Sequence, residues 1–472
     1  LWNNEYMHFA LHATRFYLYD MISLDGVEES TLLSRLTTPV NRQIIRFFNY
    51  AETLSKPKLI GFLFFFTFLI ASPIFIGYEI SNPTDREDDK DIRIFRDRAQ
   101  TILDGDVLYR DTEYVTVSPP IINYLFIPAV LLGNTAAAWM AWFTFFLFLT
   151  STVIYFTLEP FFDKKTAIAA SMMYAASPFG HYTSALMLQD DAMIVTFLSL
   201  SFMFISRKQW YWAATALSFG TLTKLFPALC SPLAVLGPKS TYKKVKIAVF
   251  GLAIGFLICL PFLLLASTEF LQFIEFYLLG TQPSSPGKMS MTVTAIEQRG
   301  MSFWRFVGES IVFIPNSILH CLLLVSLVCI WGLAWVRKID MISAFTLCII
   351  SIFIFYSKIH YGYHIMLIAV LIPWSMHHAQ RLWGLFAVTF LASAVHVAWR
   401  DRLFTDSLVV HTSLALVLWC YWANWARIIL MNPNFEAYCG GKRSNNSILI
   451  SSGWVLILSL GYTIIMGALK AI

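Results

Sequence analysis

Long apolar stretches alternate with short polar ones along most of the chain. Eight of these stretches are close to the roughly 20 residues that a helix needs to cross a membrane; they are 58–78, 136–158, 244–267, 316–336, 340–357, 382–399, 408–431 and 447–470. Shorter apolar pieces lie at 121–134, 166–178, 191–206, 209–223, 225–237 and 362–375. The pattern predicts an all-α polytopic membrane protein with roughly 13 transmembrane helices.

Composition agrees with this fold class. The 472 residues are 57% hydrophobic and only 13% charged, and 41 of them are Phe. The formal net charge of +5 is small for this length and gives no reason to expect nucleic acid as a partner. Six of the seven cysteines lie inside apolar stretches, which argues against a disulfide framework or a thiolate metal site.

Lysine and arginine in the short loops predict which loops share a side of the membrane. Basic residues at 207–208, 239–246, 337–338, 381 and 442–443 are compatible with a single cytoplasmic face. The loops 79–120, 189–191, 268–305, 357–364 and 400–407 then lie on the outer or lumenal face. Residues 121–178 contain three apolar pieces where an even number of crossings is needed, so we expect one of them to be a partial span or to be joined to its neighbour.

This arrangement divides the chain into four parts. Residues 1–57 are expected to form an N-terminal cytoplasmic or interfacial segment, and residues 58–267 a transmembrane module that includes the outer loop 79–120. Residues 268–305 form a second outer loop, whose "TQPSSPG" start suggests a mobile substrate lid. Residues 306–472 form a C-terminal transmembrane module.

The outer loop 79–120 is dense in charge, with 11 Asp or Glu and 6 Lys or Arg. After Asp91, apolar residues recur with the spacing of one helical face at Ile92, Phe95, Ala99, Ile102 and Leu103. We expect an amphipathic helix with Asp91 as its N-cap and Gly105 at its end, lying flat on the membrane with its Arg side chains outward. The alternative is an ordinary solvated acidic loop.

Two further groups of polar residues border apolar stretches. Gln189, Asp190 and Asp191 open a span, where carboxylates are costly and usually face a cavity; the alternative is a helix N-cap, which needs only one acid. Lys224 separates two apolar pieces too short to cross the membrane alone, so it is expected near the turn of a short hairpin. A recessed ammonium there suits a lipid phosphate, although snorkelling to the interface would also explain it.

The stretch "SKIHYGYHIM" brings His360, Tyr361, Tyr363 and His364 to the outer end of another span. We favour hydrogen bonding over metal binding for these side chains, because no HExxH-type Glu accompanies the histidines. Arg299 lies in the second outer loop and adds a cation to the same face.

Three stretches carry a resemblance to the GT-C superfamily of membrane glycosyltransferases. "DKDIRIFRDRAQTILDGDVLYRDTEYVTVSPP" is similar to the first outer loop of these enzymes, and "ASPFGHYTSALMLQDD" resembles their second outer motif. "TLTKLFP" resembles their Lys-aromatic-Pro stretch. The resemblance covers residues 55–240 and is strongest to GT87-type enzymes and to the mannosyltransferase that adds the first mannose of GPI anchors. The chain departs from the latter where "QDD" replaces an Arg-Gly-Asn type run.

The resemblance implies an inverting transfer of a mannose-like hexose or a pentose from a polyprenyl- or dolichyl-phosphate donor. It places Asp91 at the catalytic carboxylate and makes Asp89 the first acid of a DxD motif, where a divalent metal (Mg or Mn) is possible but not expected to be obligatory. Lys224 or Arg299 would stabilise the leaving phosphate. Gln189, Asp190, Asp191, His360, Tyr361 and His364 would contact substrate.

The expected partners are a lipid-phosphate sugar donor, a glycan, lipid or protein acceptor, and membrane lipids. The expected location is a prokaryotic plasma membrane or the endoplasmic reticulum, with the active site on the outer or lumenal face. The alternatives are a lipid or solute transporter or flippase, and a non-catalytic subunit of a membrane complex. No inverted repeat or pair of broken spans supports a transporter. An enzyme requires that Asp91, Asp190 or Asp191, and Lys224 line one pocket.

Overall fold

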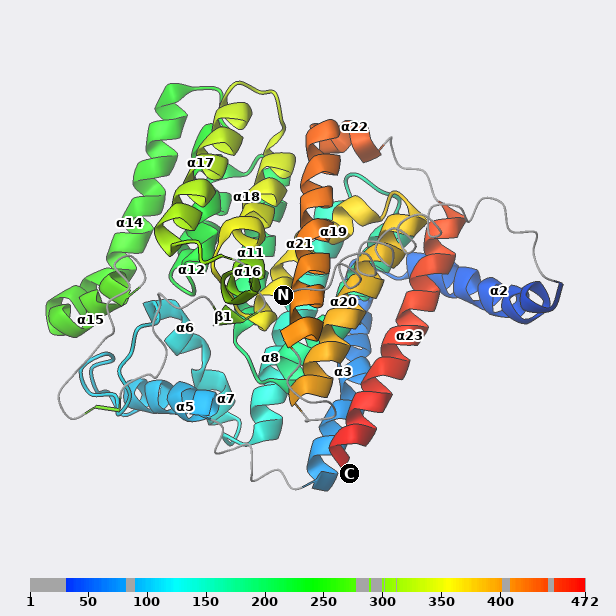
Figure 1. Cartoon of the computed structure of the whole chain (residues 1–472), viewed down its shortest axis with the longest axis horizontal. Helices are drawn as coiled ribbons and strands as arrows, with labels where there is room; N and C mark the ends of the chain where they lie inside the picture. Colours follow the sequence, from blue (N-terminus) through cyan, green and yellow to red (C-terminus); the bar gives the residue numbers. More distant parts are fainter. Residues whose placement is uncertain are drawn as a thin grey trace.

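The structure, a computed structural model, describes residues 31–81, 90–276, 288–289, 299–300, 302–310, 312–400, 408–439 and 445–471. These residues fold almost entirely into helices (Figure 1). The first half contains α2 (Thr31–Thr53), α3 (Lys56–Ser81), α5 (Lys90–Leu103), α6 (Pro120–Leu125), α7 (Ile127–Leu131), α8 (Ala136–Leu158), α9 (Lys164–Ala175), α10 (Pro178–His181), the π-helical turn η2 (Tyr182–Leu186), α11 (Asp191–Ser206), α12 (Trp210–Thr221), the 3₁₀ turn η3 (Phe226–Cys230) and α13 (Ser231–Leu236).

The second half is built in the same way. It contains α14 (Thr241–Leu265), α15 (Ser267–Ile274), β1 (Arg299–Gly300), α16 (Phe303–Ser310), α17 (Asn316–Trp335), α18 (Met341–Phe355), β2 (Lys358–Ile359), the 3₁₀ turn η5 (Tyr361–Tyr363), α19 (His364–Ser375), α20 (Ala379–Arg400), α21 (Leu408–Met431), α22 (Phe435–Cys439) and α23 (Asn446–Ala471). The two short strands pair in parallel. The prediction of an all-α fold is therefore confirmed, with this one small exception.

Six helices in the described part of the chain are long and apolar enough to cross a membrane. They are α3, α8, α14, α17, α23 and the Val410–Met431 part of α21. Shorter apolar helices cover Pro120–Leu131, Asp191–Ser206, Phe226–Leu236, Met341–Phe355 and His364–Ser375. The predicted pieces at 166–178, 209–223 and 382–399 are helical as α9, α12 and α20 but are not among these apolar helices. The chain is an integral membrane protein, and the number of about 13 crossings stays a prediction.

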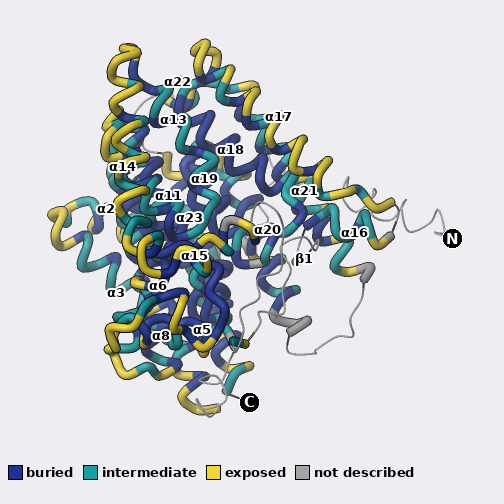
Figure 2. Tube along the Cα trace, turned by 90° about the vertical axis from the view of Figure 1, so that its left-hand side faces the viewer, coloured by how far each residue is buried: buried dark blue, intermediate teal, exposed yellow. Residues whose placement is uncertain are grey.

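The centre of the bundle is a continuous apolar core (Figure 2). Helices α3 and α23 pack backbone to backbone within it. A Cβ atom at Gly77 would lie 2.2 Å from the carbonyl oxygen of Gly467, and one at Gly467 would lie 2.1 Å from that of Pro73. Only residues without a side chain permit this approach, which is common between membrane helices. By contrast, α14 and α17 expose many apolar side chains, as expected of helices that face lipid.

The basic loops gather at one end of the bundle. Arg337 donates to the carbonyl oxygen of Gly237 (2.9 Å), and the Lys244 ammonium lies 4.0 Å from the ring centroid of Trp335. Asp340 accepts a hydrogen bond from the backbone N–H of Phe435, which brings the 432–438 turn to the same place. These contacts bring the basic loops at 239–246 and 337–338 together, as predicted, whereas the basic residues at 442–443 lie outside the described residues. The assignment of these loops to the cytoplasmic side of the membrane remains a prediction.

The amphipathic helix α5 lies across the opposite end of the bundle (Figure 1). The predicted apolar face is buried at Ile92, Phe95 and Ala99, but it packs against protein rather than lipid: the Phe95 ring stacks on Phe126 at 4.3 Å. Two details of the prediction are wrong. Asp91 lies in the first turn and is not the N-cap, because the helix already includes Lys90.

The second correction concerns the arginines of α5. Arg98 is buried rather than directed outward, and its guanidinium donates to the Ser118 hydroxyl at 3.0 Å. Asp97 fixes the following loop by accepting the backbone N–H groups of Glu113 (2.9 Å) and Tyr114 (3.2 Å). Gly105, with φ of +82°, follows the helix as predicted, since such a backbone conformation favours glycine. These bonds fix α5 to the end of the bundle, with Asp91 at its start.

Candidate functional site

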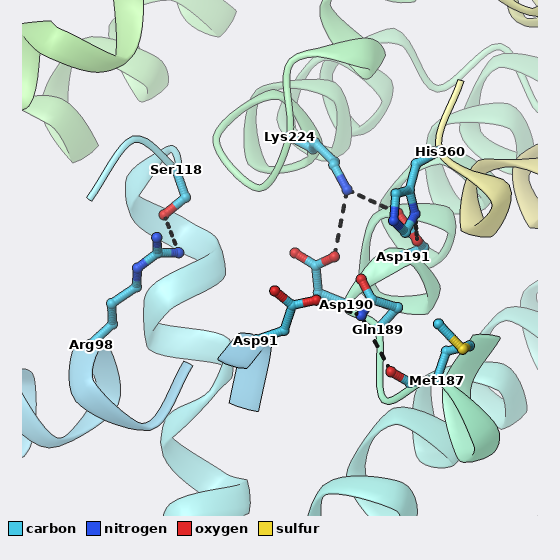
Figure 3. A network of polar contacts seen from close by, with 9 residues as sticks. All are labelled: Asp91, Arg98, Ser118, Met187, Gln189, Asp190, Asp191, Lys224 and His360. Carbon is cyan, nitrogen blue, oxygen red and sulfur yellow. Dashed lines mark hydrogen bonds and ion pairs between the residues drawn. The ribbon is translucent and has the colours of Figure 1, made fainter. Parts of the chain in front are cut away.

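Four segments that are far apart in the sequence bring polar side chains together at the α5 end of the bundle (Figure 3). Asp91 comes from the first turn of α5, and Gln189, Asp190 and Asp191 come from the start of α11. Lys224 lies between α12 and η3, and His360 lies between β2 and η5. We refer to these six residues as the polar cluster.

Asp91 is held by a residue from the second segment. The Gln189 side-chain amide donates one hydrogen bond to Asp91 Oδ2 at 2.9 Å and another to the carbonyl oxygen of Met187 at 3.2 Å. The backbone N–H of Gln189 donates to the carbonyl oxygen of Thr183, in the π-helical turn η2, at 3.0 Å. Gln189 is therefore anchored on both its backbone and its side chain, and it presents an N–H to the carboxylate.

Lys224 lies between two carboxylates. Its ammonium is 2.9 Å from Asp191 Oδ1 and 3.5 Å from Asp190 Oδ1. Burial opposes the charge, but the carboxylates of Asp190 and Asp191 outweigh it and raise the pKa of Lys224 well above its usual value. The ammonium also lies 4.5 Å from the ring centroid of Tyr363. Lys224 is therefore a charged member of the polar cluster.

The fold explains how a lysine reaches this depth. Helix α12 has 12 residues, and the η3–α13 segment that returns beside it has 11, so neither is long enough to cross the hydrocarbon. Lys224 lies at the turn between them, as the sequence predicted. The turn is fixed to the start of α6, because the backbone N–H of Ile121 donates to the carbonyl oxygen of Leu222 at 2.9 Å.

Asp190 and Asp191 differ in their exposure. Asp190 is at the N-cap position of α11, yet its side chain makes no capping hydrogen bond, which removes the capping alternative for this residue. Its side chain is 18% exposed, whereas that of Asp191 is 2% exposed. The Asp190 side chain is therefore partly accessible, whereas the Asp191 side chain is enclosed by protein.

The β2–η5 segment encloses Asp191. His360 Nδ1 lies 3.9 Å from Asp191 Oδ2, and a Cβ atom at Gly362 would lie only 2.0 Å from the same oxygen. The backbone at Gly362 thus contacts the carboxylate directly. Burial, followed by the nearby Lys224 ammonium, lowers the pKa of His360 to about 4, so the imidazole is neutral at pH 7.

Gly362→Ala is a direct test of this contact. Gly362 is not among the described residues with positive φ, so the effect of a methyl group is steric: it would overlap Asp191 Oδ2 and lie 3.3 Å from the Thr183 methyl group. We expect a loss of roughly 1–3 kcal/mol in unfolding free energy, measured by thermal unfolding in detergent. Gly332→Ala in α17, where no atom lies within 4 Å, is the control. Equal behaviour of the two variants would contradict the contact.

Not every predicted site residue is part of this arrangement. Asp89 lies outside the described residues, and so do the side chains of Arg299 and Tyr361. His364 is buried in α19, where its described ring neighbours are Phe179 at 5.6 Å, Phe353 at 5.1 Å and Trp422 at 6.1 Å. Its surroundings are those of a core residue.

The sequence reasoning named Tyr363 but missed Gly362. The glycine between two tyrosines could have indicated the contact with Asp191, because a glycine often marks a place where another group closely approaches the backbone. Among the described residues, no group of three or more His, Cys, Asp or Glu is placed to hold a metal ion.

The predicted lid at 268–305 begins in α15 and ends in α16, and residues 277–287, 290–298 and 301 lie outside the described residues. Two short described pieces lie between these helices. In the first, the Lys288 ammonium donates to the carbonyl oxygen of Tyr109 at 2.6 Å, and Met289 pairs with Tyr114. In the second, β1 pairs with β2 beside His360. The loop thus connects the loop after α5 to the segment that carries His360.

Comparison with known proteins identifies relatives of this chain. The sequence model of Glycosyltransferase family 87 matches residues 117–357. This range includes Gln189, Asp190, Asp191 and Lys224 but ends short of His360 and begins after Asp91. No curated protein matches the sequence.

Two solved structures of ArnT from Cupriavidus metallidurans are similar to the chain at 14% sequence identity. The structure bound to undecaprenyl phosphate has a TM-score of 0.51 and is aligned over 87% of this chain and 77% of that one. The apo structure has a TM-score of 0.49, with 86% and 76% covered. At this identity the likeness to the structure bound to undecaprenyl phosphate shows the fold alone, which is the predicted GT-C fold.

Proposed function

The chain belongs to glycosyltransferase family 87, and from this premise we propose that it transfers a sugar from a polyprenyl-phosphate donor with Asp91 as the general base. The observation that carries the proposal is the polar cluster. Asp91, which the resemblance places at the catalytic position, is hydrogen-bonded to Gln189 and adjoins the acids and lysine of the second and third motifs (Figure 3). The donor class is further supported by the related fold of ArnT, whose structure was solved with undecaprenyl phosphate.

The proposed reaction is a single inverting displacement. The Asp91 carboxylate takes the proton of the acceptor hydroxyl while that oxygen bonds to the anomeric carbon of the donor sugar. The bond from the anomeric carbon to the phosphate oxygen breaks, and the lipid phosphate leaves with the electron pair. Because the phosphate is already a good leaving group, it needs a cation beside it rather than a general acid.

The two acids of α11 have different parts in this proposal. Asp190, which is partly exposed, binds hydroxyl groups of the sugar or of the acceptor. Asp191, enclosed by Lys224 and Gly362, orients the lysine instead of touching substrate. His360, neutral and partly exposed, is a hydrogen-bonding group at the edge of the site.

We further propose that the transferred sugar is a mannose-like hexose or a pentose, and that the acceptor is a glycan, lipid or protein. The active site would face the outside of a prokaryotic plasma membrane, or the lumen of the endoplasmic reticulum with a dolichyl-phosphate donor. These finer assignments rest on the resemblance of the outer-loop motifs.

A transfer assay tests the proposal. Purified protein in detergent is incubated with undecaprenyl-phosphate mannose, or with the matching pentose donor, and with membrane lipid extract as the source of acceptors. Mass spectrometry then follows sugar-bearing products and released undecaprenyl phosphate. Absence of both transfer and donor hydrolysis across hexose and pentose donors would overturn the proposed reaction.

Gln189 is proposed to position Asp91 through the 2.9 Å hydrogen bond. Gln189→Leu removes a hydrogen bond to a charged group and should lower kcat by roughly 10- to 100-fold, with little change in KM for the donor. Gln189→Glu should lower kcat further, because it places a second carboxylate against Asp91. If the Glu variant keeps the wild-type kcat, the hydrogen bond does not serve catalysis.

A further inference from the structure

Helix α2 extends sideways from the bundle, past the end of α23 (Figure 1). Residues 54–55 alone separate its end at Thr53 from Lys56, where α3 begins. Helix α3 is one of the described helices that are long and apolar enough to cross the membrane. Since α3 enters the hydrocarbon at this point, α2 lies at the surface of the membrane.

One face of α2 packs on the bundle and fixes the helix about its own axis. Ile44 and Phe48 are buried on this face. A Cβ atom at Gly453 of α23 would lie only 2.5 Å from the Ile44 side chain. One residue further along α23, the Trp454 indole N–H donates to Asn41 Oδ1 at 2.9 Å. The other faces of α2 are therefore presented in defined directions.

A second face of α2 carries aromatic side chains toward the lipid. Phe47 is 37% exposed and Tyr50 is 67% exposed, and their spacing of three residues places them on the same side of the helix. The Phe47 ring centroid lies 6.0 Å from that of Phe62. Phe62 is about 9 Å from the start of α3 along its axis, so Phe47 reaches toward the hydrocarbon. Aromatic side chains are common at this depth of a membrane.

The third face of α2 carries two arginines. Arg42 and Arg46 are exposed and one helical turn apart, about 200° around the helix from the buried face. In the described part of the chain, neither guanidinium has a carboxylate within ion-pair distance. The only acid of α2, Glu52, is paired with Lys165 at 3.3 Å. Like charges at this spacing repel each other, and an anion bound by both would offset the repulsion.

We infer that Arg42 and Arg46 bind the headgroup of an anionic phospholipid of the membrane, whose acyl chains lie beside Phe47 and Tyr50. Arg46 and Phe47 are neighbours on the helix surface, so the guanidinium lies at the level of the headgroups where the ring reaches the hydrocarbon. Guanidinium groups suit phosphate because their N–H groups form a planar fork that matches its oxygens. A zwitterionic lipid cancels its phosphate charge with its own ammonium, so the site should prefer an anionic lipid.

Hydrogen exchange of α2 tests this inference without any need for turnover. The full chain is placed in nanodiscs of phosphatidylglycerol, or of phosphatidylcholine with the same acyl chains, and exchange of the backbone amides at 40–53 is followed by mass spectrometry. In the wild type, phosphatidylglycerol should slow this exchange by roughly 5- to 30-fold, because each arginine near an anionic surface contributes about a fivefold factor. Inorganic phosphate added to phosphatidylcholine nanodiscs should not slow it.

Three double variants locate the effect. Arg42→Gln/Arg46→Gln should remove the difference between the two lipids while exchange in phosphatidylcholine stays as in the wild type. Arg42→Lys/Arg46→Lys, which keeps both charges, should retain most of the difference. The matched control is Lys243→Gln/Lys246→Gln, which removes two exposed charges from α14 and should leave exchange in α2 unchanged.

Four results would overturn the inference. The first is equal exchange of wild-type α2 in the two lipids, and the second is a lipid preference that Arg42→Gln/Arg46→Gln retains. The third is an equal loss of the preference in the α14 control, which would show that the overall charge attracts the lipid. The fourth is protection by inorganic phosphate equal to that by phosphatidylglycerol, which would show a site for free anions. If the glutamine variant also exchanges faster in phosphatidylcholine, the arginines stabilise α2 by themselves and the assignment fails.

Discussion

Asp91→Asn should lower the rate of sugar transfer by about 10²- to 10⁴-fold. The substitution removes the base but keeps the shape of the side chain, and the asparagine carbonyl oxygen can still accept the 2.9 Å hydrogen bond from Gln189. The polar cluster should therefore stay assembled, with donor binding and thermal unfolding close to those of the wild type. The measurement is the initial rate of product formation with a saturating donor.

Asp104→Asn is the matched control for this variant. Asp104 follows the same helix, is exposed, and accepts a hydrogen bond from the Gln100 amide at 2.8 Å. Asp104→Asn changes the charge of the outer loop by the same amount as Asp91→Asn. Because Asp104 is not part of the polar cluster, its substitution should leave transfer unchanged. If Asp91→Asn retains more than a tenth of the wild-type rate, another group takes the proton and the assignment of Asp91 as general base is wrong.

The positions of the helices could be predicted from the sequence because they depend on local hydrophobicity. The predicted stretch at 136–158 has the same bounds as α8, and that at 191–206 has the bounds of α11. The recessed position of Lys224 followed from the lengths of two apolar pieces and the charge of the loops beside them. These properties need no knowledge of which helices are neighbours.

The groups that pack against α5 could not be predicted from the sequence in the same way. Its apolar face was predicted, but an amphipathic face indicates only that something apolar covers it. Membrane lipid and the rings of Phe126 and Trp139 satisfy the sequence equally well. For the same reason the burial of Arg98 was missed, because its acceptor, Ser118, becomes a neighbour only after the loop folds back.

The candidate site was predicted as a set of residues but not as a set of contacts. The sequence indicated that Asp91, Gln189, Lys224 and His360 share one end of the bundle. It did not indicate that Lys224 is paired with Asp190 and Asp191, nor that Gly362 covers one of these acids. Such contacts depend on the three-dimensional path of the 357–364 segment.

Lys224→Met should produce the largest loss of stability at the site. It leaves Asp191, which is 2% exposed, without the ammonium 2.9 Å away, and Asp190 without its cation at 3.5 Å. Removing one partner of a buried ion pair typically costs about 3–5 kcal/mol, because the remaining charge is uncompensated. We expect a clear fall in the unfolding temperature in detergent, whereas Lys224→Arg, which keeps the charge, should fall less.

The double variant Lys224→Met/Asp191→Asn distinguishes an electrostatic origin from a packing one. Removing the enclosed carboxylate together with the ammonium restores the balance of charge at the pair, so the double variant should be more stable than Lys224→Met alone. If instead the two losses simply add, the pair contributes through packing and Lys224 is free to serve another partner.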